Sequence, residues 1–334
     1  MTKIAILDDW QGIARDSADW SRLAERAELH FFEDAFADED AAASALAACD
    51  IVLSMRERTP LPGSLIARLP GLRMLGITGP KNATLDLAAC TARGVVVCNT
   101  EGSGRGAPAP AELALGLLLA AARGIPAADA NMRAGRFQQG LPVGITLAGR
   151  TLGLVGLGRL GARMARYGQA MDMEVLAWSR NLTDEAATAA GATRVSLDTL
   201  LERSDAVSLH LVLAEGTRGI LGAGELARMR PGAILINTSR GPLVDEAALV
   251  DAVQGGRIVA ALDVFDREPL PADHPLRHAG NTVLVPHLGY GVAETWADFY
   301  PQSVENARAF LDGAPVRVIN PGVLAGLASG GHPG

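Results

Sequence analysis

Three residues able to handle a proton and a carboxylate each follow a short apolar run in the C-terminal half of the chain. They are Arg240, Glu268 and His287. A guanidinium can grip a carboxylate through two hydrogen bonds and polarise a neighbouring carbonyl group. A histidine titrates near neutrality, and a carboxylate on its other ring nitrogen fixes the tautomer and favours the protonated form. Together the three side chains are suited to the reduction of an oxo acid.

Each of the three residues also has a purely structural explanation. Arg240 can cap a helix or pair with the acidic residues that follow it. Glu268 can be a loop carboxylate beside Arg267, and His287 can be a histidine whose ring is satisfied locally. A nucleotide-binding pattern upstream of all three favours the chemical explanation.

That pattern occupies residues 151–180, which read as a strand, a glycine turn, a helix and a second strand. The glycines have the spacing G-x-G-x-x-G. The first permits a tight turn, the second lets backbone approach a pyrophosphate, and the third lets the helix pack closely on the strand. The helix N-terminus offers N–H groups and a positive dipole end to the phosphates. We therefore predict dinucleotide binding. The expected contact residues are Gly156, Gly158, Arg159, Leu160 and Gly161.

The end of the second strand indicates which dinucleotide is used. NAD-specific folds place an acidic residue there, on the ribose hydroxyls. Here the chain has Ser179 and Arg180, while Asp172 and Glu174 come too early. We therefore expect NADP(H) to be favoured, with Arg180 gripping the 2′-phosphate. The alternative is NAD(H), with Arg180 stacked on adenine or pointing to solvent.

Composition limits the class of protein. A length of 334 residues suggests two domains, and 49% hydrophobic residues exclude a disordered chain. The net charge of −7 argues against a nucleic-acid or acidic-membrane surface, and no apolar run reaches the length of a membrane span. The cysteines lack CxxC pairing and the histidines lack metal-ligand spacing. We expect a cytoplasmic protein with buried thiols, no signal peptide and no metal.

Apolar runs of strand length alternate with helical patterns along most of the chain. Five such runs in the first part predict an α/β domain with a parallel sheet. A Gly- and Pro-rich loop follows at 100–110, then a nearly wholly apolar helix over 111–123 and a polar loop over 131–149. A doubly wound pattern begins at Thr151. The predicted fold class is therefore α/β, with two Rossmann-like or flavodoxin-like domains.

The segments GLGRLG, NTSRGPLVDEAAL, ALDVFDREPLP and PHLGY, in this order, resemble the D-isomer-specific 2-hydroxyacid dehydrogenase family, which includes glyoxylate/hydroxypyruvate reductases and phosphoglycerate dehydrogenases. The resemblance extends to about Asn320. It implies a substrate-binding domain at 1–103, a nucleotide domain at 104–289 and, within 290–334, a helix that returns to the substrate domain. It also implies a cofactor cleft between the domains and a homodimer. The tail over 321–334 is Gly- and Pro-rich, so we expect it to be frayed.

The resemblance further implies hydride transfer between NAD(P)H and a 2-oxo acid/D-2-hydroxy acid pair. By the family pattern Arg240 binds the substrate, Glu268 supports the histidine, and His287 is the acid/base. Asp263 corresponds to the position that meets the nicotinamide carboxamide. The residues expected to border the cofactor are Thr238, Ser239, Asp263 and Gly289.

Family members contact the substrate carboxylate through a glycine loop after the fourth strand, and this chain departs from the common pattern there. The loop contains Gly79, Pro80 and Lys81, and Pro80 lacks an N–H donor. Arg56, in a stretch similar to the family's R-S-x-T, follows another strand. We expect these four residues to bind substrate in a cationic pocket suited to a bulky or twice-anionic acid. The alternative is that Arg56 and Lys81 are solvated charges beside Glu57.

Two other functions are compatible with the same scaffold. One is a dinucleotide-sensing binding protein similar to the transcriptional corepressors that resemble this family. The other is the oxidation of a different small anion, as in formate or phosphite dehydrogenases, although the polar set expected around the histidine of formate enzymes is absent from the sequence.

Overall fold

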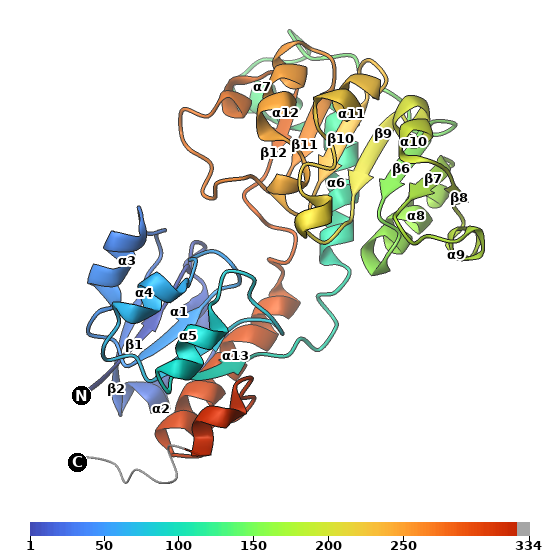
Figure 1. Ribbon diagram of the computed structural model, residues 1–334. Helices are drawn as coiled ribbons and strands as arrows, with labels where there is room; N and C mark the ends of the chain where they lie inside the picture. Colours follow the sequence, from blue (N-terminus) through green and yellow to red (C-terminus); the bar gives the residue numbers. More distant parts are fainter. Residues whose placement is uncertain (326–334) are drawn as a thin grey trace. The chain divides into compact units, whose positions relative to one another are not determined.

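The computed structural model describes residues 1–325, which form two compact units (Figure 1). One unit consists of Met1–Gly106 and the segment that begins at Ala293, and the other is Ala107–Val292. Both boundaries lie three residues after the predicted divisions at 103 and 289. The predicted tail falls mostly outside the described residues. The predicted α/β class with parallel sheets is confirmed, while the predicted cleft between the domains stays a prediction.

The first unit is built on a five-stranded sheet with the order β2-β1-β3-β4-β5, in which all neighbours are parallel. The strands are short apolar runs that helices cover on both faces, as expected for a parallel sheet. The strands are β1 (Thr2–Ile6), β2 (Ala27–Phe31), β3 (Ile51–Ser54), β4 (Met74–Ile77) and β5 (Val96–Asn99).

Two helices of the first unit, α3 and α5, begin after an aspartate whose side chain caps them. Asp38 accepts a hydrogen bond from the Ala41 amide, and Asp86 accepts one from the Ala89 amide. Two one-turn helices after β1 were not predicted, because four residues are too few to show a helical period. The helices are α1 (Ala14–Ser17), α2 (Ser21–Ala24), α3 (Glu39–Leu46), α4 (Gly63–Ala67), α5 (Leu87–Ala92) and α13 (Ala293–Leu311).

The C-terminal segment belongs to the first unit. Helix α13 packs on β4 and on the short helices α1 and α2 (Figure 1). Beyond it, Val318 forms an antiparallel bridge to Cys98 of β5. The buried Asn320 then closes the arrangement, because its Oδ1 accepts from the Val97 amide and its Nδ2 donates to the Val95 carbonyl.

The second unit is built on a seven-stranded parallel sheet with the order β12-β11-β10-β9-β6-β7-β8. The strand order reverses between β6 and β9, which makes the sheet doubly wound and places a topological switch point there. The strands are β6 (Thr151–Val155), β7 (Glu174–Trp178), β8 (Thr193–Arg194), β9 (Ala206–Leu209), β10 (Ile234–Asn237), β11 (Val259–Leu262) and β12 (Thr282–Leu284).

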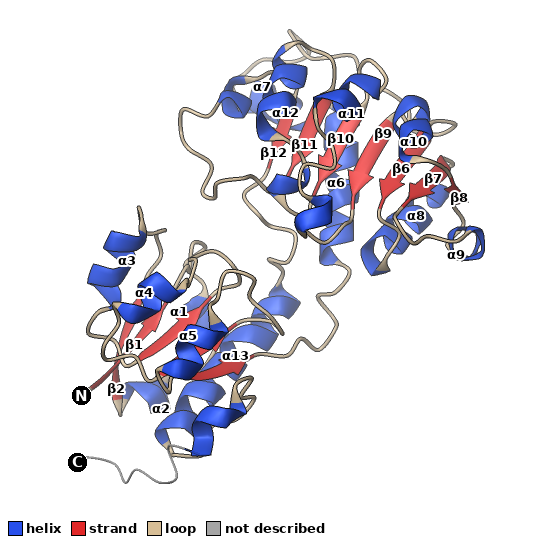
Figure 2. Ribbon diagram, in the orientation of Figure 1, coloured by secondary structure: helices blue, strands red, loops and turns tan. Residues whose placement is uncertain are grey.

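Two layers of helices cover this sheet (Figure 2). Helices α6 and α8 pack on one face, and α10, α11 and α12 pack on the other. The alternation along β6 fits this arrangement, since Leu152 and Leu154 belong to the first core and Val155 to the second. The helices are α6 (Ala109–Arg123), α7 (Ile125–Arg133), α8 (Arg159–Ala170), α9 (Asp184–Ala189), α10 (Leu197–Arg203), α11 (Ala223–Arg228) and α12 (Glu246–Gln254).

Helix α7 differs from the sequence-based expectation, which placed a loop from residue 131. The chain turns by 67° at Gly124, which adopts a left-handed conformation (φ 61°), and α7 starts directly after it. Pro126 in its first turn has no N–H to leave unsatisfied. Over residues 1–325 no single helix has the length and apolar character of a membrane span, although α6 and α7 reach them as a bent pair.

Replacing Asn320 by alanine is expected to lower the free energy of unfolding by about 2–4 kcal/mol. The substitution leaves the Val97 amide and the Val95 carbonyl without this partner in a buried setting. Urea unfolding followed by tryptophan fluorescence measures the effect, because Trp10, Trp20 and Trp296 all lie in the first unit. A change below about 0.5 kcal/mol would show that the C-terminal segment does not hold this unit together.

Candidate active site

The three proton- and carboxylate-handling residues lie at one edge of the second sheet. Arg240 follows β10, Glu268 follows β11, and His287 follows β12. These strands are consecutive neighbours and run parallel, so their carboxyl ends meet at the same edge. Ligands of doubly wound sheets bind at this edge.

Glu268 and His287 form a direct pair. The Nδ1 of His287 lies 2.5 Å from the Oε2 of Glu268, and the other carboxylate oxygen of Glu268 accepts a hydrogen bond from the Phe265 amide at 3.0 Å. The His287 side chain is 16% exposed, and the Glu268 side chain is 21% exposed. A carboxylate at Nδ1 fixes the orientation of the ring and leaves Nε2 as the nitrogen for chemistry. The predicted contact between Glu268 and the histidine is present.

The backbone around His287 is held by Asp263, the residue directly after β11. The His287 amide donates to the Asp263 carbonyl at 2.8 Å, and His287 adopts a left-handed conformation (φ 54°). The Asp263 carboxylate accepts from the Leu288 amide at 2.5 Å and from the Gly289 amide at 2.9 Å. Asp263 is fully buried, and burial raises its pKa to about 6. Asp263 therefore fixes the loop that carries His287, and its expected contact with the nicotinamide stays a prediction.

The loop that carries Arg240 is equally restrained. The Nδ2 of Asn237 donates to the Arg240 carbonyl, and the Ser239 hydroxyl donates to the Leu209 carbonyl. The Arg240 guanidinium donates to the Ser239 carbonyl at 2.7 Å and is partly buried. The next residue, Gly241, packs so closely on the following loop that a Cβ there would lie 2.2 Å from the Phe265 backbone. The loops bearing Arg240 and Glu268 are thus in backbone contact.

The glycine turn of the second unit fits a pyrophosphate. Gly156 has φ 103°, and a Cβ on it would lie 2.6 Å from the His210 carbonyl oxygen. A Cβ on Gly161 would lie 2.1 Å from the Gly156 carbonyl oxygen, whereas Gly158 faces open space. Gly158 is the N-cap of α8 and no side chain caps this helix, so its first N–H groups are directed at the turn. Gly156 and Gly161 therefore meet the steric demands that the spacing predicts, while the approach of a pyrophosphate at Gly158 stays a prediction.

The end of β7 carries no carboxylate. Ser179 and Arg180 follow the strand, whereas Glu174 is its first residue and lies at the opposite edge. The exposed Arg180 guanidinium donates to the Gly216 carbonyl at 2.9 Å. This contact holds Arg180 across the end of the sheet, between β7 and the turn after β9.

In the first unit the substrate-binding candidates also lie at strand ends. Arg56 follows β3, and Gly79 to Lys81 follow the adjacent β4. The Arg56 guanidinium donates to the Thr78 carbonyl at 3.0 Å and covers Gly79, where a Cβ would lie 1.9 Å from Nη1. The Gly79 amide donates to the Thr100 hydroxyl. Arg56 also lies 3.9 Å from Glu57, while Pro80 and Lys81 are exposed.

One buried carboxylate of the first unit, that of Asp8, is not among the site residues predicted from the sequence. Asp8 accepts hydrogen bonds from the Thr59 amide and hydroxyl, and its carbonyl accepts one from Arg58. Burial raises the pKa of Asp8 to about 6. The guanidinium of Arg58 lies over the Trp10 ring at 4.4 Å. In the sequence, Asp8 could have been recognised by its position just after β1, because residues that follow parallel strands lie at the same edge of the sheet.

Other titratable residues have structural surroundings. Burial lowers the pKa of His210 to about 4, and its Nε2 lies 2.9 Å from the Ser208 hydroxyl. The thiols of Cys49, Cys90 and Cys98 are buried and unpaired. In the part of the chain that the structure describes, no group of three or more His, Cys, Asp or Glu residues could hold a metal ion.

Comparison with known proteins gives a consistent picture. Residues 115–289 match the family model "D-isomer specific 2-hydroxyacid dehydrogenase, NAD binding domain". The chain is 39% identical over 265 residues to a glyoxylate reductase of Aeropyrum pernix, covering 77% of this chain and 78% of that protein. It is 36% identical over 264 residues to a D-3-phosphoglycerate dehydrogenase of Archaeoglobus fulgidus, covering 79% of this chain and 50% of that protein. The chain thus spans about half the length of the phosphoglycerate dehydrogenases it matches.

Solved structures resemble the chain over nearly its full length. A Ralstonia solanacearum protein described as a D-3-phosphoglycerate dehydrogenase oxidoreductase has a TM-score of 0.87 and 36% identity, covering 97% of this chain and 98% of that one. A phosphoglycerate oxidoreductase from Vibrio cholerae has a TM-score of 0.86 and 35% identity, covering 94% and 100%.

The raised pKa of Asp263 predicts a pH dependence of stability that Asp263→Asn removes. Because the folded pKa of about 6 exceeds the ordinary 3.8, this group's contribution is fully present below about pH 3.8 and is lost as the pH rises through 6. The difference corresponds to about 3 kcal/mol. Urea unfolding of both proteins between pH 4 and 7 measures it. Parallel pH profiles for the two proteins would contradict the assignment.

Proposed function

Since the chain belongs to the D-isomer specific 2-hydroxyacid dehydrogenase family, we propose that it interconverts a 2-oxo acid and a D-2-hydroxy acid with a nicotinamide dinucleotide. The observation that carries the proposal is the 2.5 Å pair of His287 and Glu268 beside the loop of Arg240. The corepressor alternative is not favoured, because the relatives compared above are named as dehydrogenases and reductases.

The cofactor's place is at the glycine turn and the N-terminus of α8. Gly156 and Gly161 shape the turn, and the uncapped amides of α8 suit a pyrophosphate. A bound reduced nicotinamide dinucleotide would supply the hydride that adds to the carbonyl carbon. The family model that matches this unit is an NAD-binding domain.

The side chains of this chain supply the remaining chemistry. Arg240 grips the substrate carboxylate and polarises the carbonyl group. The protonated Nε2 of His287 delivers a proton to the carbonyl oxygen, and in the reverse direction it takes the proton from the hydroxyl group. Glu268 keeps Nδ1 bonded and the ring aligned throughout. The Asp263 carboxylate accepts hydrogen bonds from the two amides that follow His287, and so keeps the imidazole ring in one position.

Replacing His287 by alanine is expected to lower kcat by about 10²–10⁴-fold, which is the usual contribution of a general acid–base. The dissociation constant for the dinucleotide should change less than about threefold, because the glycine turn is untouched. Initial rates of NAD(P)H oxidation and fluorescence titration measure the two quantities.

The matched control is His278→Ala, which removes an exposed imidazole of the same unit and should leave both quantities unchanged. A His287→Ala protein with more than about a tenth of the wild-type kcat would refute the acid–base role.

We propose that NADP(H) is the favoured cofactor. The support is Ser179 and Arg180 at the end of β7, where a carboxylate would repel a 2′-phosphate. The contact of Arg180 with the Gly216 carbonyl keeps the guanidinium at this position, and a guanidinium has further N–H groups to offer. Use of NAD(H), with Arg180 on adenine or in solvent, is the alternative.

Arg180→Ala should raise the KM for NADPH by about 10–100-fold, the cost of one charge-assisted contact, and change the KM for NADH less than about threefold. Arg194→Ala, which removes another exposed arginine of this unit, is the control. If the wild-type kcat/KM with NADH equals or exceeds that with NADPH, the cofactor assignment is wrong.

We further propose that the substrate site of the first unit recognises its anion with side-chain cations. Pro80 offers no N–H, and the Gly79 amide is already bonded to Thr100. The Arg56 guanidinium, fixed over Gly79, occupies the face that the loop presents. With the exposed Lys81 it suits a bulky or twice-anionic 2-oxo acid. The alternative is that Arg56 is balanced by Glu57 and that the substrate is small and singly charged.

A homodimer is the proposed assembly, in the cytoplasm. Four large apolar side chains are exposed within one segment of the second unit, around α7 and the loop after it, and exposed apolar side chains in one segment suit a protein interface. They are Ile125, Met132, Phe137 and Val143.

A further inference from the structure

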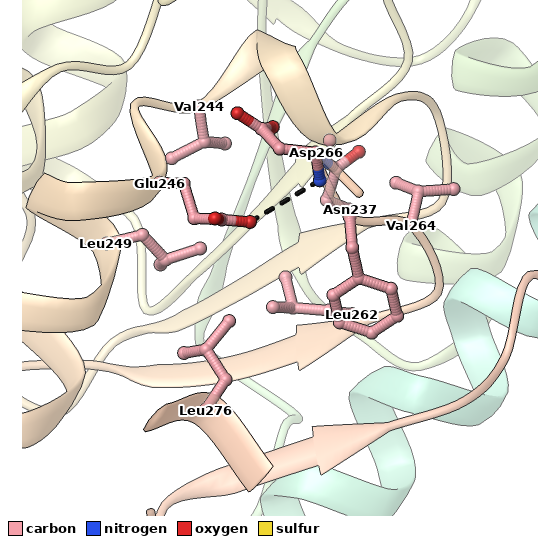
Figure 3. Close-up of a pocket in the computed structure, with 10 residues that line it drawn as sticks. Asn237, Val244, Glu246, Leu249, Leu262, Val264, Asp266 and Leu276 are labelled. Atoms are coloured by element: carbon pink, nitrogen blue, oxygen red, sulfur yellow. Dashed lines mark hydrogen bonds between the residues drawn. The ribbon is translucent and has the colours of Figure 1, made fainter. Parts of the chain in front are cut away.

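A small pocket lies behind the loops that carry Arg240 and Glu268. Its lining is mostly apolar and includes Val244, Leu249, Leu262 and Leu276. Figure 3 shows the carboxylate of Glu246 inside this pocket, directed at the backbone nitrogen of Asp266. A charged group on an apolar wall needs partners, and those of Glu246 come from two different segments.

The first partner is the Asp266 amide, which donates to Oε2 of Glu246 at 3.4 Å. The second is His274, whose Nε2 lies 3.3 Å from Oε1. The Nδ1 of His274 accepts a hydrogen bond from the Leu276 amide, which leaves Nε2 as the ring nitrogen that faces Glu246. His274 is 13% exposed and Glu246 is 31% exposed.

The chain between these two partners includes Glu268. The consecutive amides of Phe265 and Asp266 are divided between two glutamates, since Phe265 donates to Glu268 and Asp266 donates to Glu246. Glu268 uses its remaining oxygen for His287. Glu246 thus fixes the turn from one side, and Glu268 extends from the same turn to the histidine.

The position of Glu246 at the start of helix α12 stabilises its contact with the turn. Glu246 is the first residue of this helix, and the N-cap Asp245 accepts from the Ala248 amide. A carboxylate in the first turn is favoured by the helix dipole. The charged groups that act on Asp266 are Glu246, Asp245 and Arg218, and its pKa is raised by burial first and then by the charge of Glu246.

We propose that Glu246, supported by His274, is a positioning residue that holds the turn 265–268 so that Glu268 stays on His287. The inference rests on the proposed function, because it acts through the proposed acid–base. Its effect should fall on kcat rather than on dinucleotide binding. A merely structural Glu246 would act independently of Glu268, whereas a positioning residue has nothing left to position once Glu268 is lost.

The test is a double-mutant cycle with Glu246→Ala and Glu268→Gln, measured by NAD(P)H oxidation with the best 2-oxo acid. Glu246→Ala should lower kcat by about tenfold, and in the Glu268→Gln background by less than about twofold. The dinucleotide dissociation constant should stay within about twofold of wild type. Glu246→Gln, which still offers an oxygen to the Asp266 amide, should recover part of the loss and serves if the alanine variant is unstable.

Asp245→Asn is the matched control, because it removes a neighbouring negative charge and asparagine still caps a helix. Its kcat should equal that of wild type. Two results would overturn the inference in a wild-type protein that turns over a 2-oxo acid. One is a double mutant in which the two reductions in kcat multiply, and the other is a set of Glu246 variants with wild-type kcat. A wild-type protein that turns over no 2-oxo acid would overturn the proposed function and the inference together.

Discussion

The hydrogen bond between Glu268 and His287 is the contact on which the proposed chemistry of this protein depends. At 2.5 Å, and between two side chains that are mostly buried, it fixes both the tautomer and the direction of the imidazole. A free histidine in a loop would sample several rotamers and both tautomers. The partner carboxylate comes from the neighbouring strand, so the bond requires β11 and β12 to be adjacent and parallel.

The surrounding loops serve this bond through backbone contacts. The carboxylate of Asp263 accepts hydrogen bonds from the two amides after His287. This arrangement buries an acidic group, and burial raises its pKa. Gly241 brings the Arg240 loop against the Phe265 backbone, which any side chain at that position would prevent. These contacts explain why a site built from three loops can be rigid without a dense network between the three functional side chains.

Much of this arrangement follows from local sequence. Strand-length apolar runs locate the sheet, and parallel topology then brings the residues after β10, β11 and β12 to one edge. The glycine spacing predicts the turn before α8, because each glycine there answers a steric demand of the fold. Helix α7 also has a local signal in the sequence. A glycine followed two residues later by a proline, as at Gly124 and Pro126, is typical of one helix ending and another beginning.

Other features depend on contacts between distant segments and have no local signal. The packing of Arg56 over Gly79 needs β3 and β4 to be neighbours. The contact of Glu246 with His274 joins residues 28 positions apart, and although Glu246 lies in the segment NTSRGPLVDEAAL, His274 lies in none of the quoted motifs. A role assigned by family pattern is also incomplete, because a motif gives the position of a residue but not its hydrogen bonds. For Asp263 the pattern does not predict the hydrogen bonds to the Leu288 and Gly289 amides.

The central claim is that this chain performs hydride and proton transfer on a 2-oxo acid. The most direct measurement is the initial rate of NADPH and NADH oxidation by the wild-type protein with monocarboxylic, dicarboxylic and phosphorylated 2-oxo acids. We expect turnover, with the highest kcat/KM for a twice-anionic acid. A preference for small neutral side chains would contradict the cationic substrate site, and the absence of turnover with every acid and both cofactors would contradict the claim itself.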